Sequence, residues 1–127
     1  MLSGGKELMD ERRKYIRFPV QLDARYVEKN EENWKECSVI DISREGMGIS
    51  IYSREMINRG ALLWLQITLP VEKNPVAVEG TLIWIRDQKE DPQFNYICGV
   101  TLSSIRPEDK WLLMDYAYEG WNQEKGK

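Results

Sequence analysis

Apolar and polar residues alternate along much of this chain. In the first alternating run, Val20, Leu22, Ala24 and Tyr26 lie on one face, and the residues between them are mostly polar. A period of two is typical of a strand with one buried face. Five further runs of strand length follow, at residues 34–42, 47–52, 61–69, 76–85 and 96–102. The pattern therefore predicts six short β-strands.

The spacing of apolar residues changes near the C-terminus. Pro107 suits the first turn of a helix, and the acidic residues Glu108 and Asp109 would lie at the positive end of the helix dipole. Apolar residues then recur at helical spacing. The residues expected to pack on the rest of the protein are Trp111, Leu112 (or Met114), Tyr118 and Trp121.

Six closely spaced strands and one helix predict a mainly β fold, a six-stranded antiparallel, Greek-key-like β-barrel with a C-terminal α-helix. Residues 1–11 are polar and charged and are expected to form a flexible N-terminal arm. The barrel domain with its helix would cover residues 12–121, and 122–127 would be a polar tail. Gly80 interrupts the fifth run and predicts a bulge or a close backbone approach.

Composition excludes several classes of function. The chain has 127 residues, a net charge of −3 and a pI near 5.1, so we expect one domain and no direct contact with a nucleic-acid polymer. It lacks histidine, and its two cysteines, Cys37 and Cys98, are far apart in sequence. A zinc site or a catalytic Cys/His or Ser/His pair is therefore excluded, and we expect no metal, no cofactor and no enzymatic activity. Both cysteines are expected to be buried.

No apolar run approaches the length of a membrane span, and the N-terminus has no apolar signal segment. We therefore expect a cytoplasmic protein without membrane insertion.

The densest charge in the chain is a basic cluster near its start. Arg12, Arg13, Lys14 and Arg17 place four cations in six residues of a chain that is acidic overall. Such a run can simply be solvated. It can also hold an anion, because the guanidinium fork matches a phosphate, a carboxylate or the O6/N7 edge of guanine.

A second motif lies between the second and third predicted strands. It is Asp41-x-Ser43-x-x-Gly46, a turn that combines a carboxylate, a small hydroxyl and a glycine able to take φ > 0 or to approach a ligand closely. A carboxylate suits the two donors on the Watson–Crick edge of guanine, and an arginine suits the acceptors on the Hoogsteen edge. Together, the two motifs could bind guanine on both edges.

The order Arg13-x-x-x-Arg17 followed by Asp41-x-Ser43-x-x-Gly46, with an all-β pattern after it, resembles the PilZ domain family of bacterial cyclic di-GMP receptors. The resemblance covers about Arg12 to Trp121. It implies that Arg13 and Arg17 contact phosphate and the guanine O6/N7 edge. It also implies that Asp41 contacts guanine N1/N2, that Ser43 contacts a phosphate or a base, and that Gly46 keeps the turn open.

Two further residues join the site through the same resemblance. An arginine directly before the first motif, here Arg12, is associated in the family with binding of an intercalated pair of cyclic di-GMP molecules. Trp84 lies where a tryptophan can stack on a purine, although it could equally fill the barrel. The other tryptophans, Trp34, Trp64, Trp111 and Trp121, are expected in the core or against the helix.

The expected function is binding of cyclic di-GMP, relayed through an ordered N-terminal arm to an unidentified effector protein. One alternative is a ligand-free PilZ-like adaptor that acts through protein–protein contacts, although the chain keeps every motif position. A second alternative is a barrel that binds single-stranded nucleic acid, but the negative net charge of the chain argues against it.

Overall fold

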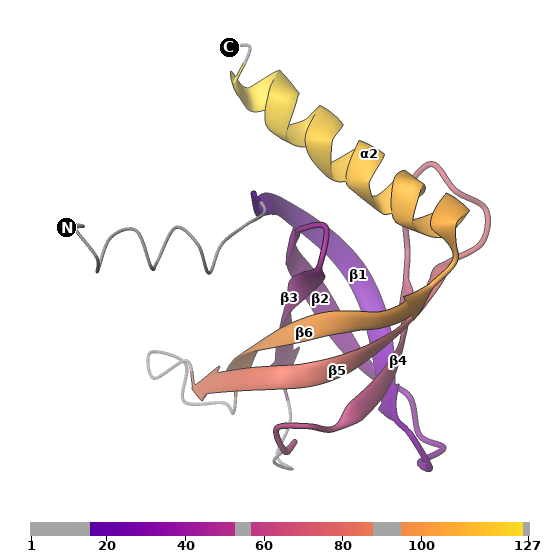
Figure 1. Ribbon diagram of the computed structural model, residues 1–127, viewed down its shortest axis with the longest axis vertical. Helices are drawn as coiled ribbons and strands as arrows, with labels where there is room; N and C mark the ends of the chain where they lie inside the picture. Colours follow the sequence, from indigo (N-terminus) through magenta and orange to yellow (C-terminus); the bar gives the residue numbers. More distant parts are fainter. Residues whose placement is uncertain (1–15, 53–56, 88–94, 126–127) are drawn as a thin grey trace, which may run out of the picture.

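The computed structural model describes residues 16–52, 57–87 and 95–125, which form a closed β-barrel and one helix (Figure 1). All strand pairs are antiparallel, and the order β1-β2-β3-β6-β5-β4 closes through pairing of β1 with β4. The predicted six-stranded barrel with a C-terminal helix is thus confirmed. The elements are β1 (Phe18–Glu28), β2 (Lys35–Ile42), β3 (Gly46–Tyr52), β4 (Leu62–Ile67), β5 (Val76–Asp87), β6 (Asn95–Ile105) and α2 (Pro107–Lys125).

The barrel core follows the alternation of the sequence. Leu22, Ala24 and Tyr26 of β1 are buried, as the period of two predicts. On β3 the inward residues are Met47, Ile49 and Ile51, all fully buried. At Gly80 the β5–β6 register shifts, and an added Cβ there would lie 2.4 Å from Val100 Cγ1, so the predicted irregularity is confirmed.

Both cysteines belong to this core. Cys37 and Cys98 are buried free thiols, as expected. Burial raises the pKa of Cys37 to about 12, with a further contribution from the neighbouring Cys98, and burial raises the pKa of Cys98 to about 11. Since the thiolate is the reactive form, neither residue is suited to nucleophilic or redox chemistry near neutral pH.

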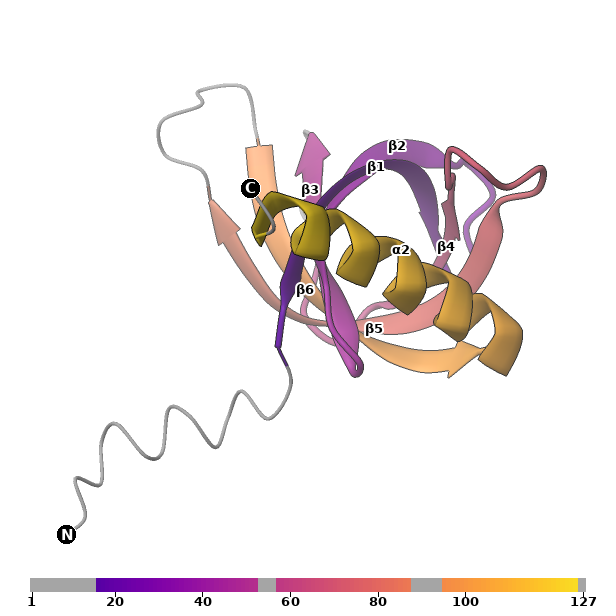
Figure 2. The same cartoon turned by 90° about the horizontal axis from the view of Figure 1, so that it is seen from above.

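The helix α2 lies across one end of the barrel and contacts β1 and β2 (Figure 2). Its buried residues are Leu113 and Ala117, whereas Trp111 is 65% exposed and Tyr118 is 47% exposed. The predicted packing is therefore wrong for Trp111. Tyr118 does pack on the barrel with part of its ring, which meets Phe18 of β1 edge-on at a centroid distance of 6.1 Å. The side chain of Trp121 lies outside the described part. The small Ala117 lets the helix backbone approach the barrel, and the bulky rings are left at the flanks of the contact.

Two other tryptophans also differ from expectation. Trp34 is 38% exposed and Trp64 is 45% exposed, so neither belongs to the core. Trp34 instead lies against the guanidinium of Arg25, 4.8 Å from the ring centroid. The helix continues to Lys125, past the end predicted for the domain. No helix in the described ranges combines the length and apolar character needed to cross a bilayer.

Candidate functional site

The β2–β3 turn is closed by Ser43 and Gly46. The Ser43 backbone N–H donates to the Gly46 carbonyl at 2.8 Å. The Ser43 hydroxyl lies 3.3 Å from both the Gly46 carbonyl and the Gly46 N–H, and the residue is 5% exposed. Ser43 therefore holds the turn in shape, and Arg44 and Glu45 occupy its exposed tip.

Gly46 is required by close packing between two strands. A Cβ at this position would lie 2.2 Å from the Val100 carbonyl oxygen on β6. Among the described residues, Gly60 is the glycine with positive φ, at +90°. Gly46 therefore does not use the positive φ that a glycine can take, and the crowding by β6 is what excludes a side chain here.

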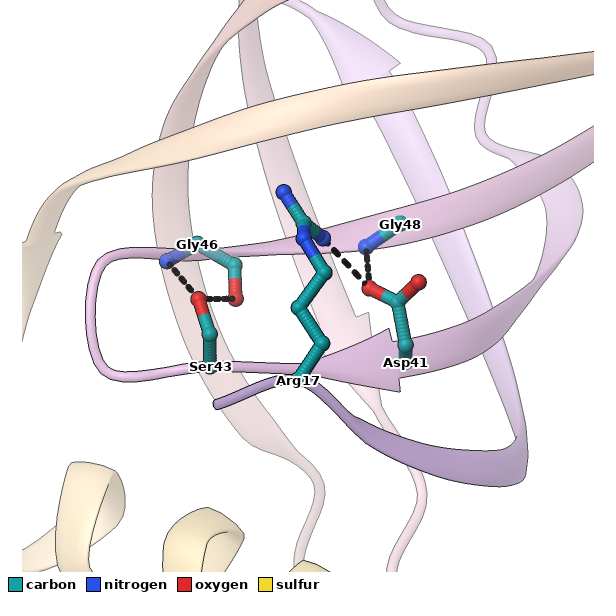
Figure 3. A network of polar contacts seen from close by, with 5 residues as sticks. All are labelled: Arg17, Asp41, Ser43, Gly46 and Gly48. Carbon is teal, nitrogen blue, oxygen red and sulfur yellow. Dashed lines mark hydrogen bonds and ion pairs between the residues drawn. The ribbon is translucent and has the colours of Figure 1, made fainter. Parts of the chain in front are cut away.

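Arg17 and Asp41 form an ion pair beside this turn (Figure 3). Arg17 Nη1 donates to Asp41 Oδ1 at 2.7 Å, and the Gly48 backbone N–H donates to the same oxygen at 2.8 Å. The side chains remain 34% and 27% exposed. The carboxylate is thus held in a fixed orientation, while both charged groups keep a surface that a ligand can reach.

The strand register places Asp41 and Trp84 in one row across the outer face of the barrel. Asp41 pairs with Gly48, Gly48 with Gly99, and Gly99 with Trp84. Three strand intervals of about 4.8 Å separate the two ends of this row by roughly 14 Å. Two side-chain-free positions therefore lie between a carboxylate and an indole.

The two glycines leave room for the side chains at either end of the row. A Cβ on Gly48 would lie 2.9 Å from Asp41 Oδ1, and a Cβ on Gly99 would lie 2.2 Å from Trp84 Nε1. Asp41 and Trp84 thus lie over the backbone of their glycine neighbours. A larger residue at either glycine would displace the group that forms the site.

Asp41 and Trp84, together with Arg17, line a pocket of about 680 Å³, a size typical of sites for drug-sized ligands. Trp84 is half-buried, lies outside the core cluster and lines this pocket, so the alternative that it fills the barrel is wrong. The lining residues are Arg17, Ile40, Asp41, Ser43, Glu45, Gly46, Ile83, Trp84, Ile85, Arg86, Ile97, Val100 and Thr101.

Sequence reasoning missed three residues that shape this site. Arg86 lines it, with its guanidinium carbon 5.4 Å from the centroid of the Trp84 ring. Gly48 and Gly99 lie between Asp41 and Trp84 in the same row and leave room for these two side chains. The spacing Trp84-x-Arg86 places both residues on one strand face and could have indicated Arg86, whereas the glycines become apparent only once the strand register is known.

The structure brings together Arg17, Asp41, Ser43, Gly46 and Trp84 from three strands, the β2–β3 turn and the residue before β1. Arg12 and Arg13 lie outside the described residues, so their placement stays a prediction. In the described ranges, no three His, Cys, Asp or Glu side chains gather as metal ligands. The pocket thus offers two guanidinium groups, the carboxylates of Asp41 and Glu45 and an aromatic face. The guanidinium groups and the indole suit a ligand that combines phosphates with an aromatic base.

Comparison with known proteins identifies the fold. The model of the family described as PilZ domain matches residues 11–119, which is most of the chain. A search of curated proteins found no match.

Three solved structures illustrate the likeness. The Bacillus subtilis inhibitor of motility MotI/DgrA has 22% identity and a TM-score of 0.68 over 85% of this chain and 50% of that protein. The PilZ domain of Escherichia coli YcgR with c-di-GMP has 16% identity and a TM-score of 0.67 over 90% and 94%. The MrkH–c-di-GMP complex of K. pneumonia has 14% identity and a TM-score of 0.67 over 88% and 55%. The chain therefore spans about half the length of MotI/DgrA and of MrkH.

Proposed function

The chain belongs to the PilZ domain family, and on that premise we propose that it is a receptor for cyclic di-GMP. The family consists of receptors and adaptors, so the proposed role is binding and not catalysis. The observation that carries the proposal is the Arg17–Asp41 pair at 2.7 Å on a pocket that Trp84 also lines. We place the receptor in the cytoplasm, where an intracellular second messenger is encountered.

The pocket chemistry complements a guanine dinucleotide. Asp41 offers acceptors to guanine N1–H and N2–H₂, and the guanidinium of Arg17 offers donors to O6/N7 or to a phosphate. Trp84 offers an indole face on which a purine can stack. Arg86, beside Trp84, adds a second cation to balance a dinucleotide that carries two phosphates.

The stretch directly before Arg17 completes the proposed site. Arg13 would add a third guanidinium, and Arg12 would offset the phosphates of a second cyclic di-GMP molecule bound as an intercalated pair. Ligand binding would order the arm around Arg12 and Arg13 against the barrel, and the resulting surface would be recognised by an effector protein.

Calorimetric titration of the whole chain tests the proposal. Cyclic di-GMP is expected to bind, and cyclic di-AMP to bind at least about tenfold more weakly, because adenine presents N6–H₂ where guanine presents the O6 acceptor. Two ligands per chain are expected, and Arg12→Ala should reduce this ratio to one. Absence of heat at high ligand concentration would contradict the receptor function and favour the ligand-free adaptor.

Trp84 has its own expected effect. Trp84→Ala should weaken binding of cyclic di-GMP by about tenfold or more, because a base stacked on an aromatic side chain contributes about 1–3 kcal/mol. Trp64→Ala is the matched control, since Trp64 is also a partly exposed strand tryptophan but does not line the pocket. Equal affinities for the two variants would remove Trp84 from the site.

A further inference from the structure

An apolar groove lies between the start of β1 and the outer flank of α2. It has a volume of about 470 Å³ and is lined mainly by apolar and aromatic side chains. Three of them are unusually exposed: Ile16 at 64%, Trp111 at 65% and Tyr118 at 47%. Large apolar side chains that gather in one exposed groove indicate a binding surface. The lining residues are Ile16, Phe18, Arg44, Trp111, Met114, Asp115 and Tyr118.

The groove lies directly beside a segment of the chain outside the described part. Ile16, the first described residue, is itself a wall of the groove, so residues 1–15 begin at its edge. Within that segment, the apolar pair closest to the groove along the chain is Leu8-Met9. A short tether of this kind gives an effective concentration on the order of millimolar, so even weak contacts are occupied.

The length of the segment also fits the groove. Six residues lie between Met9 and Ile16, so the seven steps along the chain reach up to about 25 Å when extended. The groove follows α2 from Trp111 to Tyr118, a rise of only about 10 Å.

We propose that Leu8 and Met9 dock in this groove of the same molecule, against Trp111, Met114 and Tyr118. The docked segment would cover the exposed rings of α2. It would also run past the tip of the β2–β3 turn, where Arg44 lines the groove and Glu45 lines the ligand pocket. The docking does not rest on cyclic di-GMP binding and is tested without ligand, so its failure and that of the receptor function are distinguishable.

Methyl NMR of the full chain, labelled at the methionine ε-methyl groups, tests the docking. The Met9 methyl signal is expected upfield of its position in a free peptide, because it would lie against the rings of Trp111 and Tyr118. Trp111→Ala should abolish most of this shift, and the exposed side chain makes the substitution tolerable. Trp64→Ala, at an exposed tryptophan outside the groove, should leave the signal in place.

Further readouts separate the possible occupants. The signal of Met47, which is fully buried in the barrel, should be the same in every variant and verifies that the fold is intact. The proposal would be overturned if the Met9 signal lay at its free-peptide position and did not change in Trp111→Ala. A Met9 shift that disappears on dilution would overturn it as well, because the groove would then be occupied by a second copy.

Discussion

Gly46→Ala is expected to lower the free energy of unfolding by about 3 kcal/mol, which corresponds to a fall in Tm of roughly 10 °C. The added Cβ would lie 2.2 Å from the Val100 carbonyl oxygen and 3.2 Å from its carbon, both backbone atoms of β6. Backbone atoms cannot rotate away as a side chain can. The β3–β6 pairing, in which Gly46 faces Thr101, would therefore have to separate locally. Urea unfolding followed by circular dichroism measures the change.

Gly120→Ala is the matched control. Gly120 is an exposed glycine within α2, and a Cβ there would meet nothing within 4 Å. Because alanine has the higher helix propensity, this substitution should stabilise the protein by about 0.5–1 kcal/mol. If Gly46→Ala cost no more than a few tenths of a kcal/mol, the close approach of β3 and β6 would be disproved.

The sequence was sufficient to predict the strands because a barrel of short strands alternates inward and outward residues. Each of the six runs overlaps one observed strand, and Leu22, Ala24 and Tyr26 face inward as the period of two requires. The turn motif could be located because a carboxylate, a serine and a glycine at fixed spacing are uncommon together. These features depend on residues close together in the sequence.

The row from Asp41 to Trp84 depends on register between distant strands. Gly48 faces Gly99 only because β3 pairs with β6, and Trp84 faces Gly99 only because a register shift lies between Leu82 and Trp84. Without that shift, alternation from Leu82 would turn Trp84 into the barrel. The local sequence does not reveal this shift. It therefore could not distinguish a Trp84 side chain that fills the barrel from one that lies on the outer face.

The helix face was ambiguous for another reason. Residues 111–114 form a continuous apolar run, so helical spacing alone did not select one side. In the structure the fully buried residues are Leu113 and Ala117, four positions apart on one face. Close packing of α2 onto β1 and β2 determines which face of the helix is buried, and it leaves Trp111 exposed at the groove.

Arg17→Ala is expected to weaken binding of cyclic di-GMP by about 100-fold, because a charge-assisted bidentate contact contributes up to about 3 kcal/mol. Asp41→Ala should have an effect of similar size, through loss of the acceptor for guanine and loss of the partner that orients Arg17. The ion pair itself is partly exposed, so breaking it should change stability by no more than about 1 kcal/mol. Weak binding would then reflect the site and not an unfolded protein.

Arg25→Ala is the control that removes an arginine elsewhere on the barrel. Arg25 also donates to a side-chain oxygen at 2.7 Å, that of Gln66, but it does not line the pocket, so wild-type affinity is expected. The double variant Arg17→Ala/Asp41→Ala then separates two roles of the carboxylate. If Asp41 only orients Arg17, removing it from the Arg17→Ala protein should change nothing further. If Asp41 binds guanine itself, as we propose, the second substitution should weaken binding again. Unchanged affinity in both single variants would place the ligand outside this pocket.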